Sequence, residues 1–152
     1  MTSISDDWQS RIQNSRPYAE VLQKLRGVGL RPTRQRLALA RLLFEDGDCH
    51  VTAEALHGRA IAAGVRVSLA TVYNTLHQFT EAGLLREVAV QSGSTYFDTN
   101  TGNHHHFYFE DSGELQDIPG EVVRFGNLPE APDGTETSRV DVVIRVRRTV
   151  GS

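Results

Sequence analysis

The sequence has a single cysteine, Cys49, among 152 residues. One thiol excludes an internal disulfide, a tetrathiolate zinc site and a redox dithiol within one chain. Any metal ion bound by one chain must therefore be held mainly by nitrogen and oxygen atoms. Cys49 itself is expected to be a small, half-buried residue.

Long apolar runs and export signals are also missing. No apolar run approaches the ~20 residues that span a bilayer. Residues 1–10 contain two aspartates but neither the basic segment nor the apolar core of a signal peptide. We therefore expect no membrane partner and a cytoplasmic location.

Common catalytic motifs are absent as well. The sequence contains no His-Glu-x-x-His, no Gly-x-Ser-x-Gly, no phosphate-binding loop and no Cys-x-x-Cys. Histidines with carboxylates can still build the metal site of a hydrolase, which is therefore the enzymatic alternative. We expect that the protein is not an enzyme.

Charge is distributed unevenly along the chain. Residues 1–90 hold 11 basic and 9 acidic residues, a net +2, whereas residues 91–152 hold 5 and 10, a net −5. A basic segment without acidic residues suits the phosphate backbone of a nucleic acid, although a solvated cationic helix face has the same composition. Such a segment consists here of Lys24, Arg26, Arg31, Arg34, Arg36 and Arg41.

Apolar residues at helical spacing predict four helices ahead of the first strand. The first helix runs from Pro17 to Leu25 and is broken by the glycines that follow. The second begins after Thr33, a side chain that can cap it, and ends at residues 45–48.

The last two predicted helices follow the same rules. The third opens at Thr52 and ends before Gly64, with Leu56, Ala60 and Ile61 facing inward. The fourth spans Leu69–Ala82, between Ser68 as its cap and a glycine stop. Its predicted buried stripe consists of Leu69, Val72, Leu76 and Phe79.

Two strand-like segments, residues 84–90 and 95–98, follow the fourth helix and flank a turn at residues 91–94. A helix-turn-helix followed by a hairpin is the winged-helix layout. In that layout the last helix enters the major groove of DNA and the hairpin, or wing, lies along the backbone.

The remaining third of the chain has a different pattern. Segments 104–110, 115–118 and 140–148 are typical of strands, and residues 121–125 form at best one or two helical turns. The expected fold is therefore α+β. It consists of an N-terminal winged helix-turn-helix DNA-binding domain (1–98), a hinge (99–103) and a small α/β dimerisation domain (104–152).

The exposed side of the fourth helix carries groups that can contact DNA. Asparagine can form two hydrogen bonds with an adenine edge, and tyrosine offers its ring to thymine methyl groups and its hydroxyl to phosphate. The candidates are the cap Ser68 and the residues Ala70, Thr71, Tyr73 and Asn74.

Three consecutive histidines, His104, His105 and His106, are the strongest chemical signal in the sequence. Side chains alternate along a strand, so His104 and His106 point to one face and His105 points to the other. Together with carboxylates from elsewhere, the first pair makes a nitrogen and oxygen site suited to Mn²⁺, Fe²⁺ or Zn²⁺.

Four ordered segments resemble the ferric uptake regulator superfamily: Gly29–Arg36, His50–Glu54, Ser68–Tyr73 and Glu81–Leu84. The resemblance continues to about residue 118. The histidine triplet and the segments Ala70–Phe79 and Arg139–Arg145 are similar to the iron response regulator branch. The resemblance implies a DNA-binding transcription regulator that controls genes of iron or haem homeostasis.

The resemblance also implies a metal site. His104 and His106 match the sensory-site histidines of the superfamily, and His50, Asp98 and Asp117 match its remaining histidine and carboxylates. Because His50 and Asp98 precede the hinge and the others follow it, metal binding is expected to set the angle between the domains.

Two departures from the family pattern are informative. Phe109 and Ser112 stand where many relatives carry a Cys-x-x-Cys pair for structural zinc, so that site is absent. A further family site, on the other side of the histidine strand, is degraded, which leaves His105 without a metal role. In iron response regulators a histidine triplet is implicated in haem binding. This makes haem a further candidate ligand, held by His104, His105 and His106.

DNA contacts and a partner also follow from the resemblance. Tyr73 matches a DNA-contacting tyrosine, Arg31 lies where a basic residue enters an A·T-rich minor groove, and Arg34 and Arg36 belong to the same basic segment. A homodimer would read an A·T-rich inverted repeat in double-stranded DNA. The two copies are expected to contact each other through apolar strand residues, notably Val140, Val142, Ile144 and Val146.

Two alternatives use the same residues. A peroxide-sensing or manganese-responsive regulator of the same superfamily would employ the same five ligands. A metal or haem carrier would explain the histidines but would leave the basic segment and the winged helix without a purpose. DNA binding discriminates the carrier from the regulators.

Overall fold

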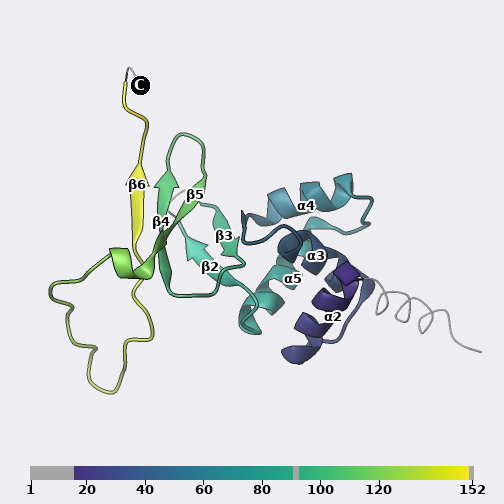
Figure 1. Ribbon diagram of the computed structural model, residues 1–152, viewed down its shortest axis with the longest axis horizontal. Coiled ribbons are helices and arrows are strands. Elements are labelled where there is room, and N and C mark those ends of the chain that lie inside the picture. The colour runs from purple at the N-terminus through teal and green to yellow at the C-terminus, as the bar shows by residue number, and fades with distance from the viewer. Residues whose placement is uncertain (1–15, 91–92, 151–152) are drawn as a thin grey trace, which may run out of the picture. The chain divides into compact units, whose positions relative to one another are not determined.

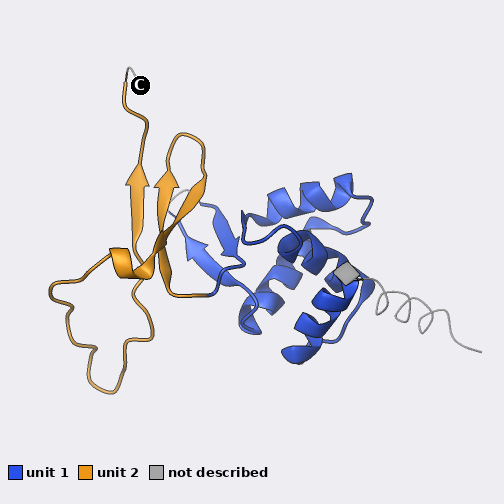
Figure 2. Ribbon diagram, viewed as in Figure 1, with its two compact units in different colours: residues 1–101 blue, residues 102–152 orange. Residues whose placement is uncertain are grey.

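The chain divides into two compact units, residues 1–101 and 102–152 (Figure 2). The computed structural model describes residues 16–90 and 93–150. Unit 1 combines helices with a small sheet, and unit 2 is built on a second sheet, so the fold is α+β as expected. No helix among the described residues is long and apolar enough to cross a membrane.

Among the described residues, unit 1 contains four helices (Figure 1). Three of them begin at a side-chain cap. The hydroxyl oxygens of Thr33, Thr52 and Ser68 each accept a hydrogen bond of 3.1 Å from the backbone N–H three residues later. The predicted starts of these three helices are therefore confirmed. The helices are α2 (Arg16–Gly27), α3 (Arg34–Phe44), α4 (Ala53–Ala62) and α5 (Leu69–Glu81).

The core of unit 1 lies between these helices and one face of its sheet. Leu56, Leu76 and Phe79 are fully buried in it, as predicted. Ile61 and Leu69, also predicted to face inward, are exposed by 54% and 36%. Ile61 lies about 140° around the helix from Leu56, and Leu69 is the first residue of α5, beyond the end of the packed stripe.

The sheet of unit 1 contains a strand that the sequence did not predict. The strands β1 (His50–Val51), β2 (Arg86–Ala89) and β3 (Thr95–Asp98) are antiparallel, in the order β1-β3-β2. The expectation that all four helices precede the first strand was wrong, because β1 lies between α3 and α4. Two residues are too few to show the alternation that reveals a strand. The predicted wing turn includes residues 91–92, which lie outside the described residues.

Unit 2 is a three-stranded sheet in the order β5-β4-β6. The strands β4 (His104–Phe109) and β5 (Leu115–Pro119) form an antiparallel hairpin, and β6 (Val143–Val146) lies parallel to β4. The chain crosses from β5 to β6 through the single 3₁₀ turn η1 (Gly120–Val122) and an irregular segment (Figure 1). Strand β6 is shorter than the predicted 140–148, and the helical turn begins at Gly120 rather than at 121.

The packing of α5 can be tested by replacing a buried and an exposed leucine of this helix with alanine. Leu76→Ala is expected to lower the free energy of unfolding by about 2–5 kcal/mol, because a fully buried leucine leaves a cavity. Leu69→Ala, on the same helix but exposed, is expected to cost roughly 1 kcal/mol or less. Urea unfolding followed by circular dichroism at 222 nm measures both. Equal losses would contradict the described packing of α5.

Candidate functional site

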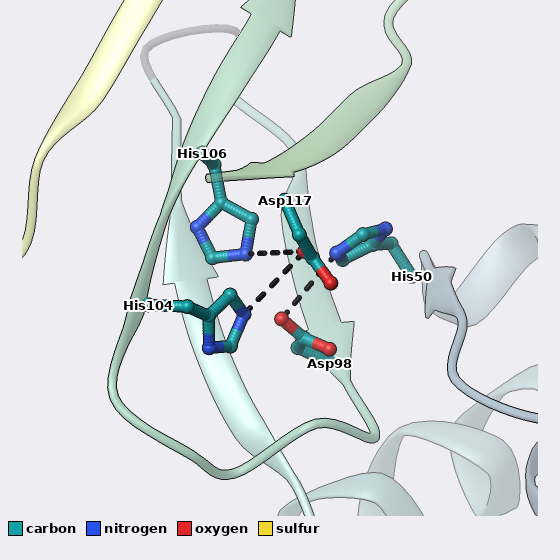
Figure 3. A group of neighbouring side chains, drawn as sticks. All are labelled: His50, Asp98, His104, His106 and Asp117. Carbon is teal, nitrogen blue, oxygen red and sulfur yellow. Dashed lines mark ion pairs between the residues drawn. The ribbon is translucent and has the colours of Figure 1, made fainter. Parts of the chain in front are cut away.

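Three potential metal ligands meet in unit 2 (Figure 3). His104 and His106 lie on the same face of β4, and Asp117 is the register partner of His106 on β5. Both histidine Nε2 atoms lie 3.4 Å from Asp117 Oδ1, and the two ring centroids are 4.6 Å apart. The histidines are buried, whereas the Asp117 side chain is 35% exposed. The alternation predicted for the triplet is thus confirmed.

The 3.4 Å spacing fits ligands that share a metal ion. An N–H···O hydrogen bond usually spans about 2.7–3.2 Å between heavy atoms. Two ligand atoms that each lie about 2.1 Å from an ion, at a tetrahedral angle, are about 3.4 Å apart. The donor set of unit 2 therefore has the chemistry and the spacing to hold a divalent cation.

A backbone contact fixes the tautomer of His104. Its Nδ1 lies 2.7 Å from the carbonyl oxygen of Gly102. A carbonyl can only accept, so Nδ1 carries the hydrogen, and Nε2 of the neutral ring is the unprotonated nitrogen. Outer hydrogen bonds of this kind orient metal-ligating histidines. His104 thus presents a lone pair toward Asp117.

A second pair of donors lies in unit 1 (Figure 3). Strand β1 pairs with β3 so that His50 is opposite Asp98, and His50 Nε2 lies 3.4 Å from Asp98 Oδ2. Asp98 is completely buried, and its Oδ1 accepts a hydrogen bond of 2.9 Å from the backbone N–H of Asn100. One carboxylate oxygen is thus anchored by the backbone while the other faces the imidazole.

His105 has a structural contact on the opposite face of β4. Its Nδ1 accepts a hydrogen bond of 3.1 Å from the backbone N–H of Val142, and its ring meets Phe125 edge to face at 5.9 Å. This buried side chain joins β4 to the segment that leads into β6. The structure therefore gives a role to the histidine for which the sequence suggested none beyond haem.

Cys49 is partly buried, as expected, and its neighbours hold the start of β1 in place. Its backbone N–H donates to Thr99 Oγ1 at 2.8 Å, and its carbonyl accepts from the Thr99 N–H at 3.1 Å. Burial raises the pKa of the Cys49 thiol. The thiol is therefore protonated at neutral pH and has little nucleophilic character.

The predicted DNA-contacting residues lie at the surface of unit 1 in several settings. Arg31, Arg34, Ala70 and Asn74 are exposed, and Thr71 is partly buried. Ser68 Oγ accepts from the Thr71 N–H as the cap of α5, and it also donates to the Thr71 hydroxyl at 3.0 Å.

Arg36 already holds two parts of unit 1 together. Its guanidinium donates to the carbonyl of Arg31 at 2.8 Å and to Gln78 Oε1 at 2.9 Å. Arg36 therefore fixes the segment that carries Arg31 against the second half of α5. A direct contact of Arg36 with DNA stays a prediction.

Tyr73 has an acidic partner that the sequence analysis missed. Its hydroxyl donates a hydrogen bond of 2.6 Å to Glu54 Oε1 on α4. This bond lowers the pKa of the Glu54 carboxyl and raises the pKa of the Tyr73 hydroxyl. Nineteen positions separate the two residues, so no local pattern could have revealed the contact.

Arg86 is another residue that sequence reasoning missed. It is 6% exposed and is the register partner of the buried Asp98. The alternation along β2 carried a signal for its burial, since Arg86 shares the inward face with Val88. A buried arginine, like a buried carboxylate, is unfavourable unless it is paired, so its register position opposite Asp98 is notable.

Comparison with known proteins gives a consistent result. Residues 27–129 match the model of the ferric uptake regulator family. The ferric uptake regulation protein of Vibrio anguillarum is 34% identical over 102 residues, which cover 66% of this chain and 68% of that protein. The peroxide-responsive repressor PerR of Staphylococcus aureus is 35% identical over 99 residues, covering 65% and 66%.

Solved structures agree. The ferric uptake regulator from Pseudomonas aeruginosa with manganese superposes with a TM-score of 0.63 at 29% identity, covering 84% of this chain and 97% of the other. The Vibrio cholerae ferric uptake regulator gives a TM-score of 0.65 at 25% identity, covering 83% and 98%. The chain therefore belongs to the ferric uptake regulator family.

Proposed function

We propose that the chain is a metal-responsive transcription regulator that binds double-stranded DNA. The observation that carries this proposal is the set of histidine and aspartate donors, most of them buried and spaced 3.4 Å apart within each unit. Buried donors of this kind are costly unless they are paired or bind an ion. The family relatives named above are regulators, one of them solved with manganese.

We propose further that His50, Asp98, His104, His106 and Asp117 bind one ion together. Only six positions separate Asp98 from His104, and that length of chain can span at most about 20 Å. Nitrogen and oxygen donors suit Mn²⁺, Fe²⁺ and Zn²⁺. An ion held by residues on both sides of 99–103 would restrict the angle between the two units, which provides a switch.

Unit 1 is the proposed DNA-binding domain. Helix α5 has an exposed face bearing Ala70 and Asn74, and the β2–β3 hairpin follows it in the order of a winged helix. The exposed Arg31 and Arg34 supply charge for phosphate or minor-groove contacts. An A·T-rich inverted repeat is the proposed target.

Unit 2 is the proposed dimerisation domain. Strand β6 is an edge strand, and Phe107, Ile144 and Gln116 share one face of the sheet by register. A hollow of ≈ 370 Å³ on that face is lined by Phe107, Phe109, Gln116, Val146, Arg147 and Arg148. An apolar sheet face of this kind is suited to a second copy, and two copies read two half-sites.

The proposed targets are genes of iron or haem homeostasis, as in the iron response regulator branch. The rival is a peroxide or manganese sensor with the same ligands, and haem binding by His104, His105 and His106 stays a prediction. The Nδ1 atom of His105 already accepts a hydrogen bond from Val142. Haem iron would therefore bind that ring through Nε2 or displace the contact.

Substitution of two adjacent histidines distinguishes a proposed metal ligand, His106, from a residue with a structural contact, His105. His106→Ala is expected to weaken Mn²⁺ binding at least about tenfold, because it removes a ligand. His105→Ala removes a neighbour on the opposite face of β4 and is expected to leave the affinity within a few-fold. Isothermal titration calorimetry with Mn²⁺ on chelator-treated protein measures both. Equal losses would exclude the proposed division of roles.

DNA binding is tested by fluorescence anisotropy with a fluorescent A·T-rich inverted-repeat duplex. Chelator-treated protein is expected to bind weakly, and Mn²⁺ is expected to restore tight binding. Asn74→Ala should then lose about 5–150-fold in affinity for the preferred duplex, the usual value of a bidentate base contact. Loss of binding on adding haem favours the haem-linked regulator. Loss when protein loaded with Fe²⁺ in place of Mn²⁺ is treated with hydrogen peroxide favours the peroxide sensor, because Fe²⁺ reduces peroxide and Mn²⁺ does not. No binding in any state would contradict the proposed regulator.

The oligomeric state tests the role of β6. The full chain is expected to sediment as a dimer at micromolar concentration. Ile144→Glu should produce monomers, because it places a charge on the proposed apolar interface, whereas Ile144→Val should leave the dimer intact. Analytical ultracentrifugation measures all three proteins. A wild-type monomer, or a dimeric Ile144→Glu variant, would contradict this interface.

A further inference from the structure

An acidic side chain on α4 is bonded to the tyrosine of the proposed recognition helix. Tyr73 Oη donates to Glu54 Oε1 at 2.6 Å. Glu54 is exposed on the first turn of α4, two residues after the cap Thr52, and Tyr73 is partly buried on α5. The helix start and the bond both favour an ionised carboxylate at this position.

The bond determines what Tyr73 can offer to DNA. A phenol has one hydrogen to donate, and here that hydrogen is directed at a carboxylate oxygen. A phosphate oxygen can only accept, so the Tyr73 hydroxyl cannot bind it while the bond to Glu54 holds. The aromatic ring packs partly against the core of unit 1, and the part of its apolar surface that remains exposed can contact a thymine methyl group.

The surroundings of the ring support this use. Ala70 lies three residues before Tyr73 on the same side of α5 and is exposed. Its methyl group is too small to cover the ring from that side. The carboxylate of Glu54 also adds negative charge at a surface that would approach a polyanion, and such a charge opposes binding that depends on phosphates alone.

We propose that Glu54 is a specificity-determining positioning residue of the DNA-binding surface. It keeps the Tyr73 hydroxyl away from phosphate, so that Tyr73 reads thymine through its ring, and its charge weakens binding to unrelated DNA. This inference rests on the proposed function. It assigns Glu54 a part in discrimination between sequences and no part in metal binding.

The test uses Mn²⁺-loaded full-length protein and three duplexes. The first is selected by the wild type from a randomised pool, the second is the same duplex with uracil in place of thymine, and the third is unrelated. Uracil lacks only the methyl group. Three variants separate the effects: Glu54→Gln removes the charge but keeps an acceptor, Glu54→Ala removes both, and Tyr73→Phe keeps only the ring.

The wild type is expected to prefer thymine over uracil by on the order of fivefold or more. Tyr73→Phe should retain this preference and the wild-type affinity for all three duplexes. Glu54→Gln should retain the preference but bind the unrelated duplex several-fold more tightly. Glu54→Ala should do the same and also reduce the thymine preference to about twofold or less.

Two results would overturn the inference. A similar several-fold loss of affinity for all three duplexes in Tyr73→Phe would show a hydroxyl-phosphate contact, because phosphate contacts do not depend on the base sequence. If Glu54→Ala leaves both the thymine preference and the affinity for the unrelated duplex unchanged, the bond between Glu54 and Tyr73 has only a structural role. If the wild type binds no duplex, the proposed function fails as well. Ultraviolet titration of the free proteins then still reports the bond, since Glu54→Ala should lower the pKa of one tyrosine.

Discussion

The cost of burying Asp98 is the constraint on which the candidate site depends. This carboxylate is completely inaccessible to water, and an isolated buried charge is unfavourable by several kcal/mol. The backbone N–H of Asn100, the imidazole of His50 and the neighbouring strand position of Arg86 are arranged around it. Strands β1 and β2 flank β3 on its two sides, and they place His50 and Arg86 at the positions that are in register with Asp98.

One part of the candidate site was predictable from strand geometry, because alternation along β4 directs His104 and His106 to one face and His105 to the other. His50, Asp98 and Asp117 followed only from the resemblance to the family, and the structure places Asp117 opposite His106 in the register of the hairpin. The helix caps Thr33, Thr52 and Ser68 were visible in the sequence because capping is a local interaction. The core positions Leu56, Leu76 and Phe79 followed from helical spacing, whereas the exposure of Leu69 depended on where the core ends.

Contacts between distant segments were not predictable in the same way. The bond from Arg36 to Gln78 joins residues 42 positions apart, and the pair Glu54–Tyr73 depends on how α4 packs against α5. Strand β1 exists only because β3 lies beside it, since two residues carry no periodic signal of their own. Sequence patterns describe faces and ends of elements well, but they do not state which faces meet.

The order of residues 50–54 connects the proposed metal ligands of unit 1 to its proposed DNA-binding surface. His50 lies in β1, Thr52 caps α4, and Glu54 on the first turn of α4 holds the hydroxyl of Tyr73 on α5. No flexible loop interrupts this segment, because strand pairing fixes its beginning and the cap fixes its end. A metal ion that moved His50 would therefore act on the backbone that positions Glu54. Residues 50–54 thus connect the proposed metal site to the tyrosine of the proposed DNA-binding surface within one unit, which is the physical link that a metal-dependent regulator requires.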